Sequence, residues 1–317
     1  MLVNLEQVFS DQTMQYIQVE KIGVYKGHND SIYALEKGIS STTFYTSGAD
    51  GMIVGWDMNQ PDNGILIAKV PNSVYALHFD ATEKELLIGQ NFEGIHLVDA
   101  VSKIEKKSVQ ITKDAIFDIK KHKDWVLVAT GDGTLIVLDK KDLSVIVKLK
   151  ISDQNLRVMA IHPNGKQIAI GGSDHLIRIL DLPSLRVLKI LKGHTNSVFT
   201  LAYSADGTTL ISAGRDAHLK VWETETFECI QSIAAHMYAI NHIDYSSSGK
   251  YFATASMDKS IKIWDANSFK LLKVIDKSRH AGHATSVNKL MWSPFNDRIV
   301  SVSDDRTISV WDIGLPE

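Results

Sequence analysis

The chain has one cysteine among 317 residues, a formal net charge of only −3 and no long apolar run. The lone cysteine, Cys229, excludes an intramolecular disulfide and fits a reducing compartment, so we expect a cytoplasmic protein. A net charge this small gives no strong general attraction for nucleic acid or anionic lipid. No apolar stretch approaches the roughly 18 residues of a membrane span. The residues from Met1 to Glu6 lack the basic start and apolar core of a secretory signal, so we expect no such signal. We expect no membrane partner.

What the chain does have is a set of four residues that recurs four times at fixed spacing. Each copy begins with a histidine, and a hydroxyl residue, an aspartate and a tryptophan follow it after 18, 22 and 28 residues. The four copies are His28, Thr46, Asp50 and Trp56; His194, Ser212, Asp216 and Trp222; His236, Thr254, Asp258 and Trp264; and His283, Ser301, Asp305 and Trp311. Identical spacing in four places indicates a repeated structural unit.

The same period continues where these marker residues are missing. The residue after the tryptophan position is acidic in all seven units, and successive units are 42, 40, 42, 42, 42 and 47 residues apart. These acidic residues are Asp57, Asp99, Asp139, Asp181, Glu223, Asp265 and Asp312. Each unit also contains short β-branched runs separated by turn residues, as in residues 198–203, 209–212 and 219–222, and such runs predict short strands.

A Gly-His near the start of a unit and a Trp-Asp near its end, at a period of about 40–45 residues, resemble the repeats of the WD40 family. Gly27-His28 with Trp56-Asp57 is one such pair, and the resemblance extends over about 290 of the 317 residues. It implies an all-β fold: a seven-bladed β-propeller with four antiparallel strands per blade, forming a single domain over residues 1–317. Proteins of this family mostly act as scaffolds or as subunits of larger assemblies.

A ring of blades leaves two open strand edges unless its first and last blades are joined. The last unit ends after its third strand, because only residues 313–317 follow Asp312. We expect residues 16–26, which include Val19 and Val24, to supply the outer strand of the last blade and to close the ring. Residues 1–15 form an N-terminal extension to which we assign no role.

The histidine, hydroxyl and aspartate of each copy have the residue types of a hydrolase triad, which needs an exposed nucleophile and an oxyanion hole. The set occurs four times, uses threonine in two copies and always includes a tryptophan, which favours a structural role. We expect the four side chains to form a hydrogen-bonded network inside the blade, because a buried polar group without a partner costs about 1–3 kcal/mol. Units without the histidine also lack the hydroxyl residue and the tryptophan. Val128 and Ile170, for example, occupy the hydroxyl position in the third and fourth units.

Neither a metal nor a cofactor is expected. His280 and His283 lie close together in the sequence, in the longer connection before the seventh unit. No cysteine is near them, and His283 already belongs to one of the four sets, so they make a weak metal site.

Propellers of this family typically bind partners on the face formed by the loops into first strands and the turns between second and third strands. One first-strand position in each blade should lie near that face, beside the central channel. Its residues in blades one to seven are Tyr33, Tyr75, Phe117, Arg157, Phe199, Asn241 and Asn288. Aromatic residues and arginine dominate binding hot spots. The alternative, that these rings only pack between blades, remains open.

Basic residues predict the chemistry of a partner. Arg215 and Arg279 should lie on the same face as Arg157, so that one side of its rim suits an acidic or phosphorylated peptide. A second basic patch is expected on the opposite face of blade three. Its members are Lys120, Lys121 and Lys123, in the turn between the first and second strands, with Lys140 and Lys141. These lysines are either a solvated surface or a docking site for an acidic partner.

We therefore predict a non-catalytic interaction scaffold, either a monomeric disc or a subunit of a larger complex, that binds a protein or peptide near the central channel. Two alternatives remain. One is an enzyme with a site at the channel mouth. The other is a reader of modified or acidic peptides, or of nucleic acid, although the net charge disfavours nucleic acid. A reader of modified lysine would need Tyr33, Tyr75 or Phe117 to converge on one point.

Overall fold

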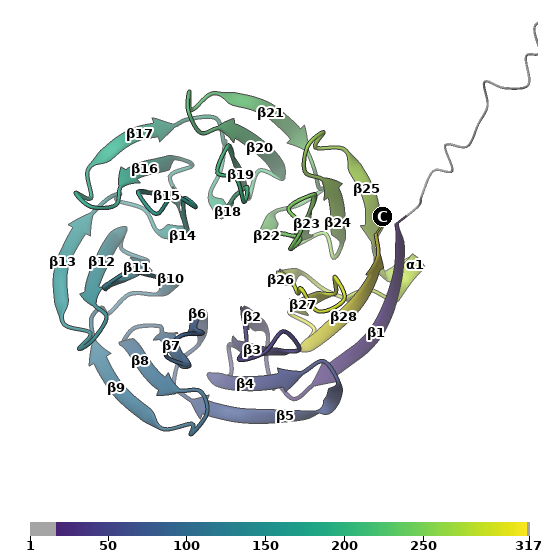
Figure 1. Cartoon of the computed structure of the whole chain (residues 1–317), viewed down its shortest axis with the longest axis horizontal. Helices are drawn as coiled ribbons and strands as arrows, with labels where there is room; N and C mark the ends of the chain where they lie inside the picture. Colours follow the sequence, from purple (N-terminus) through teal and green to yellow (C-terminus); the bar gives the residue numbers. More distant parts are fainter. Residues whose placement is uncertain (1–16, 316–317) are drawn as a thin grey trace, which may run out of the picture.

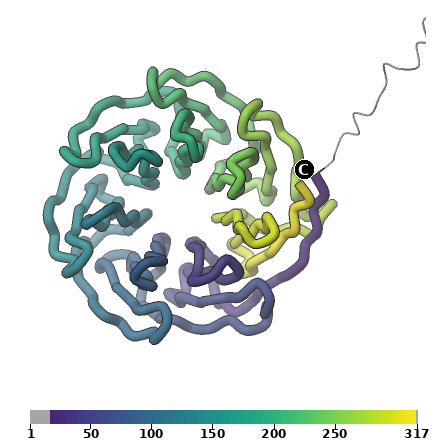
Figure 2. Tube along the Cα trace, in the orientation of Figure 1, coloured from purple at the N-terminus to yellow at the C-terminus, as the bar shows by residue number. Residues whose placement is uncertain are grey.

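Seven four-stranded antiparallel sheets are arranged in a ring around a central channel (Figure 1). The computed structural model describes residues 17–315, so the extension at residues 1–15 lies outside the described part. Within residues 17–315 the only helix is α1 (Lys277–His280), and the other regular elements are strands. The tube in Figure 2 shows that blades consecutive in sequence are neighbours in the ring. The predicted all-β, seven-bladed propeller is confirmed.

In blades 1 to 3 the strands run in sequence order from the channel to the outer edge. Blade 1 consists of β2 (Ile32–Lys37), β3 (Thr43–Gly48), β4 (Met52–Asp57) and β5 (Gln60–Lys69). Blade 2 consists of β6 (Val74–Asp80), β7 (Glu85–Gln90), β8 (Gly94–Asp99) and β9 (Glu105–Gln110). Blade 3 consists of β10 (Ile116–His122), β11 (Trp125–Thr130), β12 (Thr134–Asp139) and β13 (Val145–Lys150).

Blades 4 to 6 repeat this order. Blade 4 consists of β14 (Leu156–Ile161), β15 (Gln167–Gly172), β16 (Ile177–Asp181) and β17 (Val187–Leu191). Blade 5 consists of β18 (Val198–Tyr203), β19 (Thr209–Gly214), β20 (His218–Glu223) and β21 (Cys229–Ala234). Blade 6 consists of β22 (Ile240–Tyr245), β23 (Tyr251–Ser256), β24 (Ile261–Asp265) and β25 (Leu271–Ile275).

The hydrophobic core lies between neighbouring blades. On β11, Val126 and Val128 pack against blade 2, whereas Leu127 and Ala129 pack against blade 4. Successive side chains of a strand point to opposite faces, and both faces of a blade are covered. The middle strands therefore need apolar residues on both sides, which explains the apolar runs of β11 and β12.

Blade 7 is closed by the N-terminal strand, as predicted. It consists of β26 (Val287–Trp292), β27 (Ile299–Ser303), β28 (Thr307–Gly314) and β1 (Gln18–Lys26). Strand β1 runs antiparallel to β28, from Gln18 opposite Gly314 to Lys26 opposite Thr307. The two ends of the described chain thus pair with each other, and β28 is not left as the outer edge of blade 7.

The insertion before blade 7 forms a short helix at the rim of the ring. Helix α1 sits at the outer edge of the ring beside β1 and does not overhang the channel (Figure 1). Arg279 in this helix forms an ion pair with Asp276 at 2.6 Å, so its charge is compensated locally. The lone helix is also far too short to cross a membrane, and no candidate span occurs within residues 17–315.

Candidate protein-binding site at the channel mouth

The four recurring residues of blade 5 form one chain of hydrogen bonds, which we call the histidine network. Trp222 Nε1 donates to Ser212 Oγ at 2.8 Å, and Ser212 Oγ lies 2.7 Å from His194 Nε2. His194 Nδ1 lies 2.9 Å from a carboxylate oxygen of Asp216. Since an ionised carboxylate can only accept, Nδ1 carries the proton and Nε2 accepts from the hydroxyl. Each polar atom named here therefore has a partner.

The other three networks have the same connections. The distance from the histidine Nε2 to the hydroxyl oxygen is 2.8 Å in blade 1, 2.7 Å in blade 6 and 2.9 Å in blade 7. The indole nitrogen lies 2.7, 3.0 and 2.8 Å from the same oxygen in these blades. In blade 1 the carboxylate of Asp50 also accepts from the backbone N–H of Asn29 at 2.9 Å. The network thus fastens the turn between the second and third strands to the loop that enters the blade.

Burial prevents this set from working as a hydrolase triad. The four hydroxyl residues are 0% exposed, and each hydroxyl is enclosed between an imidazole and an indole. A nucleophile must be reached by the substrate carbonyl, and these oxygens cannot be reached. The geometry therefore serves packing and hydrogen bonding inside the blade.

Blades 3 and 4 keep the turn aspartate but give it other partners. In blade 4, Asp174 pairs with Arg178 at 2.6 Å and accepts from Ser152 Oγ at 2.7 Å. In blade 3, Asp132 accepts from the hydroxyls of Thr130 and Thr134, at 2.6 and 2.8 Å. The turn carboxylate is thus satisfied without the histidine, although sequence reasoning did not identify these substitutes.

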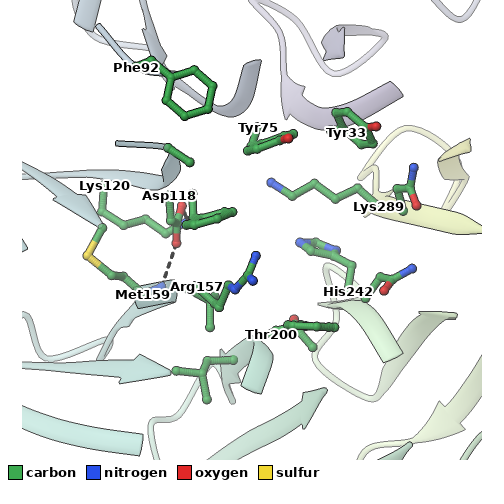
Figure 3. Close-up of a pocket in the computed structure, with 17 residues that line it drawn as sticks. Tyr33, Tyr75, Phe92, Asp118, Lys120, Arg157, Met159, Thr200, His242 and Lys289 are labelled. Carbon is green, nitrogen blue, oxygen red and sulfur yellow. Dashed lines mark hydrogen bonds and ion pairs between the residues drawn. The ribbon is translucent and has the colours of Figure 1, made fainter. Parts of the chain in front are cut away.

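A β-bulge in the first strand of each blade sets the direction of the channel-mouth side chains. The pairing register shifts around one residue in all seven first strands. The residues left unpaired at these shifts are Tyr33, Tyr75, Phe117, Arg157, Phe199, Asn241 and Asn288. A bulge locally re-aims the side chain that it leaves unpaired. All seven side chains line one cavity of about 450 Å³, which we call the channel cavity (Figure 3).

Five of these residues form a continuous row, which we call the aromatic arc. The ring centroids of Tyr33 and Tyr75 are 5.0 Å apart, and those of Tyr75 and Phe117 are 5.7 Å apart in a stacked arrangement. The guanidinium of Arg157 lies 4.2 Å from the centroid of Phe117 and 5.6 Å from that of Phe199. The rings thus contact one another in a row, and Arg157 already covers the face of Phe117 that a modified lysine would use.

The remaining predicted binding residues have different surroundings. Asn241 Nδ2 donates to Val287 O at 2.9 Å, and Asn288 Nδ2 donates to Ile32 O at 3.0 Å, so each ties its blade to the next. Arg215 is exposed in the turn between β19 and β20 and does not line the channel cavity.

Sequence reasoning missed the charged residues of the channel cavity. Asp118, Lys120, His242 and Lys289 also line it, and Figure 3 shows His242 and Lys289 pointing into the opening. Asp118, His242 and Lys289 each directly follow a bulged residue. A bulge places two successive residues opposite one residue of the neighbouring strand. The residue that follows each channel-mouth residue was therefore the position in the sequence from which these charged residues could have been predicted.

Two lysines of the predicted blade 3 patch lie in a strand and not in the predicted turn, although Lys121 still lies beside Lys123 and Lys140. Lys120 and Lys121 belong to strand β10 and not to the turn that follows it, because the strand is longer than expected. Lys120 reaches into the channel cavity and pairs with Asp118 at 3.3 Å. Lys121 forms an ion pair with Asp80, and Lys140 pairs with an aspartate of the β10–β11 turn at 3.0 Å. These pairs reduce the charge available to a partner on that face.

Four stretches of the chain match the family model described as "WD40: WD domain, G-beta repeat". They are residues 19–57, 185–223, 227–265 and 274–312, and each contains one complete histidine network. The chain is a WD40-repeat protein. Among solved structures, this WD40 propeller is similar to one titled "Crystal structure of WD40 beta propeller domain of Doa1", at 16% identity and a TM-score of 0.82. The match covers 94% of this chain and 97% of that chain, and it concerns the fold alone. A search of the curated proteins found no matching sequence.

Burial shifts the pKa of several groups inside the WD40 propeller. It lowers the pKa of Lys289, and together with the charges of Lys289 and Lys120 it holds the pKa of His242 well below 6.5. Burial and the charge of Lys120 also lower the pKa of His78 to about 4. Both histidines are therefore neutral at pH 7. In the networks, hydrogen bonds from His194 and the backbone outweigh burial and lower the pKa of Asp216 to about 2.

We expect the WD40 propeller to lose stability as the pH falls below about 6.5, because the unfolded chain then binds protons that the folded chain does not. Burial lowers the folded-state pKa of His28 and His236 as well as that of His78 and His242, so stability from these groups is present above pH 6.5 and lost below it. Urea unfolding at pH 7.5 and pH 5.0 measures the difference. His78→Gln should reduce it, whereas His175→Gln, at an exposed turn position, should not. Equal stability at both pH values would contradict this prediction.

Proposed function

We propose that this WD40 propeller is a non-catalytic scaffold that binds a protein or peptide partner across the channel mouth. The observation that carries the proposal is the aromatic arc, which brings four rings and an arginine from five blades to the wall of one cavity. Such residues dominate binding hot spots when a partner covers them. The proposal includes a cytoplasmic location, for which the single cysteine, free and exposed, is the support.

An apolar patch on blade 6 supports the same face. Met237, Tyr238 and Met257 are 83%, 60% and 56% exposed. The first two lie in the loop that enters β22, and Met257 lies in the turn between β23 and β24, where its N–H donates to Ala239 O at 2.9 Å. Loop and turn are therefore adjacent, and both belong to the face on which the channel mouth opens. Large apolar side chains grouped on an exposed surface are typical of a protein-binding site.

The repeats themselves indicate that this patch is not needed for folding. Blade 5 has Thr195, Asn196 and Arg215 at the positions of Met237, Tyr238 and Met257, and its network has the same hydrogen bonds. A blade thus forms with polar residues at these three positions. Large apolar residues in blade 6 are better explained by contact with a partner.

The test transfers the blade 5 residues to blade 6. We expect Met237→Thr/Tyr238→Asn to keep the wild-type melting temperature and to weaken partner binding by roughly tenfold or more. A partner captured from the native source is purified, and its affinity for both forms is measured by calorimetry. Val187→Thr/Leu188→Thr on the outer strand β17, where both residues are about half exposed, is the matched control and should bind as the wild type does. Equal affinity of the folded blade 6 variant would overturn the proposed face.

A further inference from the structure

The channel cavity contains more positive than negative charge. Three cationic side chains line it, those of Lys120, Arg157 and Lys289, against the single carboxylate of Asp118. Asp118 is already engaged, because it accepts from the backbone N–H groups of Ile119 at 2.9 Å and Met159 at 2.7 Å and pairs with Lys120. Arg157 and Lys289 form no ion pair within residues 17–315, although the carboxylates of Asp118 and Glu36 act on Lys289 from a greater distance and act to raise its pKa.

Neither of these two cations has a direct carboxylate partner in the described chain. Within residues 17–315, no carboxylate forms an ion pair with Arg157 or Lys289. Arg157 donates through Nε to Ser173 Oγ at 2.9 Å and is held against Phe117, which leaves its terminal N–H groups free to face the channel. Burial lowers the pKa of both groups, so a bound anion would relieve a desolvation cost that the protein alone does not offset.

A third polar group points into the same space. His242 Nδ1 is buried and has no hydrogen-bond partner among the described residues. Figure 3 shows Arg157, His242 and Lys289, from blades 4, 6 and 7, directed into one opening. A buried nitrogen without a partner is costly. Since neutral His242 donates its one N–H to the backbone of Leu290, Nδ1 accepts, and a ligand hydroxyl or N–H in the opening would satisfy it.

We propose that the channel cavity binds a phosphorylated side chain of the partner, with Arg157 and Lys289 as its counter-charges. The inference rests on the proposed scaffold function and names the chemical group that the channel mouth recognises. A phosphate monoester carries about −1.5 to −2 charge at pH 7 and three acceptor oxygens, which matches two neighbouring cations that form no ion pair. A carboxylate carries one charge and two oxygens, so it would interact less strongly with the two cations. The guanidinium of Arg157 can also donate two parallel N–H bonds to phosphate oxygens.

Peptide pools provide the probe. Pools with randomised flanking residues carry a central phosphoserine, phosphothreonine, phosphotyrosine, glutamate or serine, and retention of the full-length protein on each immobilised pool is measured. We expect at least one phosphorylated pool to retain the protein roughly tenfold more than the glutamate and serine pools. Equal retention on the glutamate pool, or no retention on any phosphorylated pool, would overturn the inference.

Variants locate the binding and separate the two proposals. Arg157→Gln and Lys289→Gln should each lower retention on the phosphorylated pool by roughly tenfold, whereas Lys123→Gln, an exposed lysine of the blade 3 turn, should not. Lys289→Gln breaks no ion pair, so it remains informative if Arg157→Gln fails to fold. If the captured partner loses affinity for Met237→Thr/Tyr238→Asn but binds Lys289→Gln normally, or binds normally after phosphatase treatment, the scaffold proposal stands and this inference fails.

Discussion

Deletion of residues 1–26 is expected to leave a chain that accumulates in the insoluble fraction. The deletion removes β1, which pairs with β28 along eight residue positions and supplies the fourth strand of blade 7. Without it, β28 becomes an exposed edge strand in a ring that no longer closes, and such edges pair with other chains. Soluble yield and thermal melting measure the effect. A soluble truncated protein that melts at the wild-type temperature would show that closure does not depend on this strand.

A single residue of β1 gives a graded form of the same test. Tyr25 is 1% exposed, its ring packs edge-on against Phe44 and Trp56 of blade 1 at 5.8 Å, and its hydroxyl donates to Met58 O at 3.0 Å. Tyr25→Ala should lower the free energy of unfolding by about 3–5 kcal/mol, in the range of large aromatic truncations in cores. Val24→Ala, at a neighbouring position that is 41% exposed, is the control and should cost far less. Urea denaturation compares the two.

Thr254→Val is expected to destabilise the protein by roughly 2–6 kcal/mol, although it keeps the shape of the side chain. The substitution removes the hydroxyl that accepts from Trp264 Nε1 at 3.0 Å and lies 2.7 Å from His236 Nε2. Two buried groups then lose their partner, and each costs about 1–3 kcal/mol. Thr195→Val, at an exposed loop position, is the control and should stay within about 0.5 kcal/mol of wild type. Urea denaturation at pH 7 measures both changes.

A double-mutant cycle tests whether the network acts as a unit. Trp264→Phe removes the indole N–H that Thr254→Val would leave unpaired. The double variant should therefore cost less than the sum of the two single variants, by about 1 kcal/mol or more. Additive costs would mean that the hydroxyl and the indole contribute independently. Additivity would contradict the account of why blades 2 to 4 lack hydroxyl and tryptophan together.

Much of the architecture could be predicted from the sequence because its signals are local. The histidine, hydroxyl, aspartate and tryptophan of one network fall within 29 consecutive residues, so their spacing reports the geometry of a single blade. The seven channel-mouth positions were found in the same way, since each blade carries its own bulge. The prediction that Lys120 and Lys121 lie in the blade 3 turn was wrong because the end of β10 was placed too early, and strand ends are the least certain part of a pattern.

The chemistry of the channel cavity depended on contacts that no single repeat contains. Lys120, Arg157, His242 and Lys289 belong to four different blades, and they meet only because the ring brings their first strands to one axis. Asp118 could be recognised as already occupied only once its bond to the backbone of Met159 in the next blade was known. The position of α1 beside β1 likewise required the ring to be closed.

The sequence by itself determined the repeat, the strand order within each blade, the histidine networks and the strand that closes the ring. These features follow from hydrophobic patterning and from residue spacing over one period of the chain. Only the tertiary structure decided which side chains share the channel, which charges are already paired and which remain free. The reason is physical: charge compensation depends on distances between residues that are far apart in sequence, and the closing of the ring fixes those distances.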